Sequence, residues 1–232
     1  MSEERVERNG EQATATAAAG APALARSSPL RYLALGDSYT IGEGVPAAGT
    51  WPFLLAAALR TRGITLDEPE VIATTGWTTD ELAAAIDADP PQGPFALVSL
   101  LIGVNNQYRG RPLAEYRQQF EQLLQRAIAL AGEDARRVLV LSIPDWGLTP
   151  FAADRDAALI ASEIDDFNAA AQACCGDYDV AFVDITPTSR EHGAEAAMLV
   201  ADQLHPSAAM YQLWARQALP VATALLAAPA AR

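Results

Sequence analysis

The chain has 232 residues, 50% of them hydrophobic, and a formal net charge of −13 from 16 basic and 29 acidic side chains. Nucleic-acid-binding proteins carry a basic stripe, and this acidic sequence has none, which argues against a nucleic-acid partner. The two cysteines, Cys174 and Cys175, are adjacent, so the sequence favours neither a structural disulfide nor a thiolate metal site, and we expect a cytoplasmic protein without metal or other cofactor.

Residues 1–29 differ in composition from the rest of the chain. They are rich in Ala, Glu, Thr and Ser and contain no aromatic residue, which predicts a disordered N-terminal tail. A secretory signal is not indicated, because the segment opens with Glu3 and Glu4 and lacks a continuous apolar core. No later run reaches the roughly 18 apolar residues of a membrane span, so no integral membrane segment is expected. Residues 30–232 are predicted to form one domain.

Strand and helix patterns alternate along this domain. Short apolar runs predict five strands, at residues 31–36, 69–76, 95–103, 136–143 and 178–185. Helical patterns lie between and after them, at residues 50–63, 78–86, 112–131 and 158–175 and from Ser207 onward, with Pro220 expected to end or kink the last one. The alternation predicts a three-layer α/β/α, flavodoxin-like domain with a five-stranded, mostly parallel sheet.

Three polar or glycine positions lie at or just beyond the ends of predicted strands: Ser38, Gly76 and Asn105. Ligands of parallel α/β sheets bind beyond the carboxyl ends of the strands, so these positions are expected to converge on one edge. Taken singly, each is commonly a turn residue or a backbone-geometry residue. Together they mark a candidate site.

An acid–histidine pair lies near the end of the chain. Of the two histidines, His205 follows Asp202 by three residues, just before the last helix. This spacing lets the carboxylate contact one imidazole nitrogen while the other faces outward, as in a general base with its orienting acid. A serine hydroxyl is a poor nucleophile until such a base removes its proton, and Ser38 is the best-placed serine.

Four sequence blocks carry a family resemblance: "GDSYTIGEG", Gly76 in "TTGWTTDEL", "GVNN" and "DQLHP". In this order they resemble the SGNH hydrolases, also called GDSL-type esterases/lipases. The resemblance implies that Ser38 is the nucleophile, His205 the general base and Asp202 the third member of a triad. It also implies an oxyanion hole formed by the backbone N–H groups of Ser38 and Gly76 and the side-chain amide of Asn105.

Two positions depart from the family pattern. Asn106 stands where the family often has aspartate, and Tyr39 stands where leucine commonly follows the serine. Tyr39, Trp77, Tyr108 and Trp146 are candidate substrate-binding residues, with local packing as the alternative role for each.

The sequence therefore predicts a serine hydrolase that acts on small or lipid-like acyl esters through an acyl-enzyme. Thioesters and O-acetylated sugars remain possible substrates, because the motifs report the chemistry and not the acyl or leaving group. The alternative is a flavodoxin-like ligand-binding module without turnover. It is disfavoured because the glycine-rich stretch lacks both phosphate-binding patterns and because the Asp202–His205 pair would be unexplained. The α/β-hydrolase fold is also disfavoured, because its Gly-x-Ser-x-Gly motif around the nucleophile would need glycine in place of Thr40.

Overall fold

The molecule is built around one parallel sheet. The computed structural model describes Met1 and residues 29–227, so the tail predicted for residues 1–29 lies almost entirely outside the described residues. The strand order is β2-β1-β3-β4-β5, and every neighbouring pair is parallel. The strands are β1 (Tyr32–Gly36), β2 (Glu70–Ala73), β3 (Leu97–Leu101), β4 (Val138–Leu141) and β5 (Ala181–Val183). The predicted flavodoxin-like α/β fold is confirmed.

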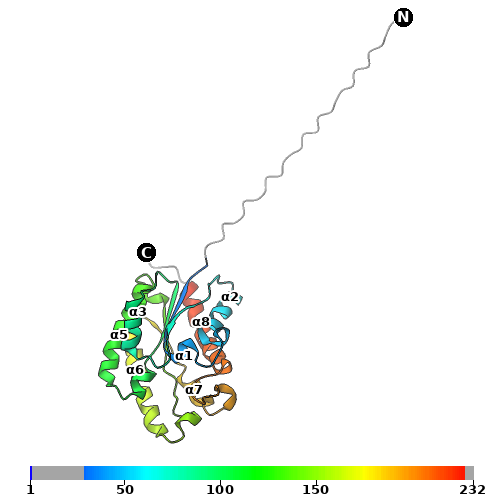
Figure 1. The fold of residues 1–232 in the computed structure, drawn as a ribbon. Coiled ribbons are helices and arrows are strands. Elements are labelled where there is room, and N and C mark those ends of the chain that lie inside the picture. The colour runs from blue at the N-terminus through cyan, green and yellow to red at the C-terminus, as the bar shows by residue number, and fades with distance from the viewer. Residues whose placement is uncertain (2–28, 228–232) are drawn as a thin grey trace.

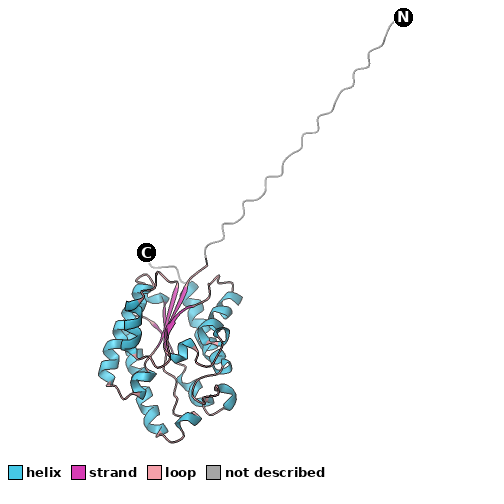
Figure 2. Cartoon of the chain, viewed as in Figure 1, coloured by secondary structure: helices cyan, strands magenta, loops and turns pink. Residues whose placement is uncertain are grey.

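Helices cover both faces of the sheet, as Figures 1 and 2 show. Helices α2 and α8 pack together on one side, and α3, α5 and α6 lie on the other. This arrangement explains why every residue of β1, β3 and β4 is buried. The long helices are α2 (Trp51–Thr61), α3 (Thr79–Ala88), α5 (Leu113–Leu130), α6 (Ala157–Asp177) and α8 (Ala208–Ala227).

Short helices fill the connections. These are α1 (Ser38–Ile41), α4 (Val104–Tyr108) and α7 (Thr186–His192), with 3₁₀ turns η1 (Ala47–Gly49), η2 (Ala135–Arg137), η3 (Pro150–Ala152) and η4 (Ala196–Met198). No helix in the described part of the chain is both long and apolar enough to span a membrane.

The start of α3 agrees with the boundary predicted from the sequence, whereas the end of α8 does not. The predicted capping box forms at the start of α3, where Thr78 and Glu81 each accept from the other's backbone N–H. Pro220 was expected to end or kink the last helix; it does not end it, because α8 continues through Pro220 to Ala227, and a kink there stays a prediction. Ala218 and Ala222, on either side of Pro220, are fully buried. Tertiary packing thus holds the helix together where proline removes a hydrogen bond.

The register of the sheet brings three strand ends to one level. Gly36, the last residue of β1, pairs with Ala73 of β2 on one side and with Leu101 of β3 on the other. A Cβ atom at Gly36 would come within 2.5 Å of the Leu101 carbonyl oxygen and would also collide with the Thr40 side chain. Glycine is therefore needed for α1 to fold back over the strand end.

Candidate active site

Ser38 is the first residue of α1, directly beyond the carboxyl end of β1. The side chain of Asp37 caps this helix by accepting from the Tyr39 backbone N–H at 3.0 Å, and Gly42 ends it in the left-handed conformation. Only 3% of Ser38 is exposed. As the first helical residue, Ser38 has a backbone N–H without a partner inside the helix. The strand stop at Gly36 thus presents both a hydroxyl and a backbone donor at the sheet edge.

His205 lies between Ser38 and Asp202. Its Nε2 atom is 3.0 Å from Ser38 Oγ, and its Nδ1 atom is 2.6 Å from Asp202 Oδ2. The other carboxylate oxygen of Asp202 accepts the backbone N–H groups of Leu204 and His205, each at 2.9 Å. The acid therefore fixes both the imidazole ring and the loop that carries it.

The environment of Asp202 keeps its carboxylate ionised. Partial desolvation acts to raise the pKa of Asp202, but the hydrogen bonds from the His205 ring and from two backbone N–H groups outweigh it and lower the pKa below its usual value. A negative charge thus faces Nδ1 at neutral pH. An imidazolium formed at His205 would be stabilised by it.

Gly76 and Asn105 line one cavity together with Ser38. Gly76 has φ +87°, a conformation that favours glycine. Helix α4 holds the turn that follows β2, because Asn105 Nδ2 donates to the Trp77 carbonyl at 2.9 Å. Arg109 Nη2 donates to the Gly76 carbonyl at 2.6 Å. The carbonyls of Gly76 and Trp77 therefore both accept hydrogen bonds from side chains of residues 105–109.

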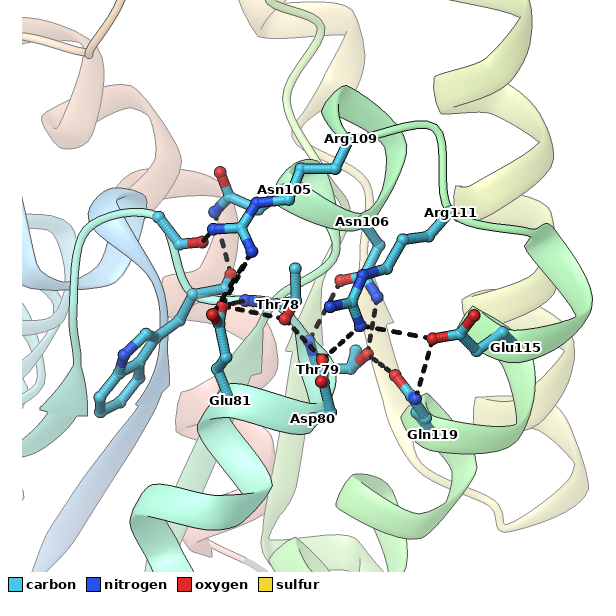
Figure 3. A network of polar contacts seen from close by, with 12 residues as sticks. Thr78, Thr79, Asp80, Glu81, Asn105, Asn106, Arg109, Arg111, Glu115 and Gln119 are labelled. Atoms are coloured by element: carbon cyan, nitrogen blue, oxygen red, sulfur yellow. Dashed lines mark hydrogen bonds and ion pairs between the residues drawn. The ribbon is translucent and has the colours of Figure 1, made fainter.

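A polar network extends this anchoring to α3 and α5, as Figure 3 shows. The Arg109 guanidinium lies 3.3 Å from a carboxylate oxygen of Glu81, whose side chain also caps α3 through the Thr78 backbone N–H. Asn106 accepts from the Thr79 backbone N–H and donates to the Thr79 hydroxyl. An amide serves both contacts, whereas the aspartate common in the family would have no N–H for the second.

Arg109 was not expected to belong to the site. Arg109 stands near Arg111 and Arg117, a short cluster that in the sequence is typical of a solvated loop and helix face, although its spacing of four residues from Asn105 would place those two residues on one helix face. Its contact with the Gly76 carbonyl makes it a positioning residue for the turn.

If the site is catalytic as the resemblance implies, replacing Arg109 by glutamine is expected to lower kcat roughly tenfold with little change in KM, because the variant loses an anchor of the turn but no contact with the substrate. Replacing Asn105 by alanine removes the side-chain amide that the family resemblance implies as an oxyanion donor, and is expected to cost about 10²–10³ in kcat. Steady-state kinetics on both variants would test whether Asn105→Ala lowers kcat more than Arg109→Gln does. An Arg109→Gln effect confined to KM would contradict the positioning role.

The cavity beside Ser38 has a volume of about 180 Å³. Of the four predicted substrate-binding residues, Tyr39, Tyr108 and Trp146 line it, whereas the Trp77 side chain packs against the core and does not. The remaining lining residues, besides Ser38, Gly76, Asn105 and His205, are Thr75, Val104, Phe151 and Leu204. Val104 and Leu204 adjoin motif residues, which is the only sequence signal that singles them out.

The carboxyl group of Asp37 is completely buried, and its Oδ2 atom has no hydrogen-bond partner among the described residues. Burial raises the pKa of Asp37 from 3.8 to about 7, although the hydrogen bond from the Tyr39 N–H acts in the opposite direction. The unfolded chain would therefore release this proton near pH 4 while the folded protein retains it to about pH 7.

Asp37→Asn is expected to stabilise the protein, and by more at pH 8 than at pH 5. The wild type is expected to lose stability as pH rises between about 4 and 7, since the folded state binds more protons at Asp37 than the unfolded state there, and the expected loss is of the order of a few kcal/mol. Asparagine keeps the acceptor for the Tyr39 N–H and does not titrate. Urea denaturation at the two pH values would measure the difference, and an equal gain at both would refute the assignment.

Other candidate groups lie away from this cavity. His192 ends α7, and its Nδ1 atom is 2.8 Å from Glu195 Oε1. Cys174 and Cys175 are buried in α6 as free thiols. No group of three or more metal-binding side chains occurs in the part of the chain that is described.

Comparisons with known proteins agree with this architecture. Among solved structures, the chain superposes on one titled TesA with a TM-score of 0.68 and 22% identity, covering 84% of this chain and 99% of that one. A lipase/acylhydrolase from Enterococcus faecalis gives 0.63 and 21%, covering 84% and 96%, and the acetylxylan esterase Axe2 from Geobacillus stearothermophilus gives 0.63 and 19%, covering 83% and 94%. These structures share the fold.

Comparison at the level of sequence identifies the family. A search among curated protein sequences gives no match. The model of the GDSL-like lipase/acylhydrolase family matches residues 34–213, which include all four sequence blocks. The chain therefore belongs to the GDSL-like lipase/acylhydrolase family.

Proposed function

We propose that the protein hydrolyses carboxylic esters through an acyl-enzyme formed on Ser38. The observation that carries the proposal is the continuous contact from Asp202 through His205 to Ser38, at 2.6 and 3.0 Å. A base within hydrogen-bond reach of the hydroxyl, itself oriented by an ionised acid, is what a serine nucleophile needs.

The reaction proceeds in two steps. In the first, Ser38 Oγ attacks the ester carbonyl carbon while His205 Nε2 takes the hydroxyl proton; the tetrahedral intermediate then expels the alcohol, which receives that proton. In the second, His205 takes a proton from water as the water oxygen attacks the acyl-enzyme. Collapse of this intermediate releases the acid and returns the proton to Ser38.

Three donors are proposed to stabilise the oxyanion: the backbone N–H groups of Ser38 and Gly76 and the amide of Asn105. Their assignment is supported by the shared cavity and by the anchored turn at Gly76. Such donors accelerate the reaction because they bind the charged intermediate more strongly than the ground-state carbonyl. No cofactor enters this scheme, and the two free thiols in α6 are consistent with the cytoplasmic location that we also propose.

The proposed function is tested by hydrolysis of p-nitrophenyl acetate and by labelling with a fluorophosphonate. We expect turnover, unaffected by EDTA, and its loss in parallel with formation of one covalent adduct on the peptide that contains Ser38. Inhibition by EDTA, or an adduct on a different serine with equal loss of activity, would contradict the mechanism. Absence of turnover on any ester would favour a ligand-binding module.

A further inference from the structure

The cavity beside Ser38 has a thin inner wall. Three of its lining residues, Tyr39, Trp146 and Leu204, also line a second, smaller cavity of about 20 Å³ deeper in the molecule. Because the same side chains bound both spaces, they separate them. Beyond the wall, the inner cavity is lined mainly by apolar side chains, including Leu199, Met210 and Trp214.

Side-chain contacts hold Trp146 in this wall. Its indole Nε1 donates to Gln107 Oε1 at 2.9 Å, and Gln107 in turn donates to Glu163 at 2.7 Å. The Trp146 ring meets Tyr108 and Phe151 edge-on, with centroid distances of 5.3 and 6.2 Å. Only 4% of the residue is exposed. The indole cannot turn aside without losing its hydrogen bond and these ring contacts.

The backbone around Trp146 is fixed as well. The Asp145 N–H donates to Ser189 Oγ at 2.8 Å, the Gly147 N–H donates to Asp145 Oδ1 at 2.8 Å, and the Thr149 hydroxyl donates to the Trp146 carbonyl at 2.7 Å. A ligand that reaches Trp146 therefore meets a rigid surface.

The outer cavity suits an uncharged apolar group. Among the described residues that line it, none is a carboxylate, lysine or arginine, and Val104, Leu204 and four aromatic rings supply its apolar surface. The polar lining residues are those of the candidate active site and Thr75. A volume of about 180 Å³ has room for roughly six groups the size of water or methylene.

We propose that this cavity binds the acyl group of the ester and that Trp146 is its end wall, which limits the acyl group to roughly six carbons with its carbonyl carbon included, since Ser38 and the proposed oxyanion donors line the same cavity. The inference rests on the proposed ester hydrolysis. It assigns Trp146 as a specificity-determining residue, one that excludes longer chains from the inner cavity. Removal of the indole would join the two spaces and extend the site toward Met210 and Trp214.

The test compares the specificity constants of p-nitrophenyl butyrate, hexanoate, octanoate and decanoate for wild type and Trp146→Leu. Each additional buried methylene is worth about a fourfold gain in binding. Two more methylenes should therefore raise the octanoate-to-hexanoate ratio of kcat/KM about 15-fold in the variant. The ratio is measured on one preparation, so the fraction of active enzyme cancels even if the variant folds poorly.

Two further variants sharpen the result. Trp77→Leu makes the same chemical change at a tryptophan that lines neither cavity and is expected to leave the ratio as in wild type. Trp146→Phe removes less of the wall and is expected to shift the ratio in the same direction by a smaller factor; it decides the question if Trp146→Leu does not fold.

The possible results separate failure of the end-wall proposal from failure of the proposed ester hydrolysis. An unchanged ratio in the Trp146 variants, or equal loss on every ester, would overturn the end-wall assignment while leaving ester hydrolysis in place. The same shift in Trp77→Leu would also overturn it, since the effect would not be specific to the wall. A wild type inactive on the whole series would instead refute the proposed function.

Discussion

Ser38→Ala is expected to abolish ester hydrolysis, with kcat reduced by up to about 10⁶. Alanine removes the atom of residue 38 that is hydrogen-bonded to His205, the Oγ atom at 3.0 Å from Nε2. Without it, no acyl-enzyme forms on this residue, and the imidazole has no hydroxyl to deprotonate. The fold should be retained, because α1 is capped by Asp37 and closed by Gly42 and does not depend on the hydroxyl.

The measurement is the initial rate of p-nitrophenyl acetate hydrolysis by both proteins, purified in the same way. Ser162→Ala is a matched control, since Ser162 is exposed on α6 and outside the cavity. It should hydrolyse the ester at the wild-type rate. Activity in Ser38→Ala equal to that of wild type would show that the nucleophile is another residue or that the activity comes from a contaminant.

The sheet and the strand ends were predictable because their signals are local. An almost entirely apolar run such as residues 97–101, in which Ser99 is the one polar residue, identifies a strand covered on both faces. Gly36 marks where β1 must stop, since only glycine fits beside Leu101 and Thr40. Thr78 and Glu81 specify a helix start within four residues. Pro220 is the exception, because packing of the whole helix decides its effect.

The walls of the cavity were less predictable because they are formed by loops from distant parts of the sequence. Trp77 and Trp146 are both aromatic residues near strand ends, yet only Trp146 lines the cavity. What separates them is a long-range contact, the hydrogen bond between Trp146 and Gln107 across 39 positions. Arg109 likewise acts on a carbonyl 33 positions away, and no local pattern reveals that contact.

Asp202→Asn is expected to lower kcat by about 10⁴ without disturbing the loop that carries His205. The reason lies in how the carboxylate is shared. One oxygen accepts the backbone N–H groups of Leu204 and His205, and the other faces Nδ1 at 2.6 Å. In the asparagine variant, the two backbone N–H groups still require an acceptor, so the side-chain carbonyl oxygen faces them. The NH₂ group is then left facing His205 Nδ1.

An NH₂ group beside Nδ1 donates to it and therefore selects the tautomer with the proton on Nε2. That nitrogen faces Ser38 Oγ and can no longer accept its proton. Loss of activity then arises from the wrong tautomer in an intact site. Asp202→Ala separates this effect from loss of the loop anchor, because it removes the partner of the backbone N–H groups as well and should also lower the melting temperature. If Asp202→Asn kept more than about a tenth of wild-type kcat, the orientation of His205 would have to come from groups other than Asp202.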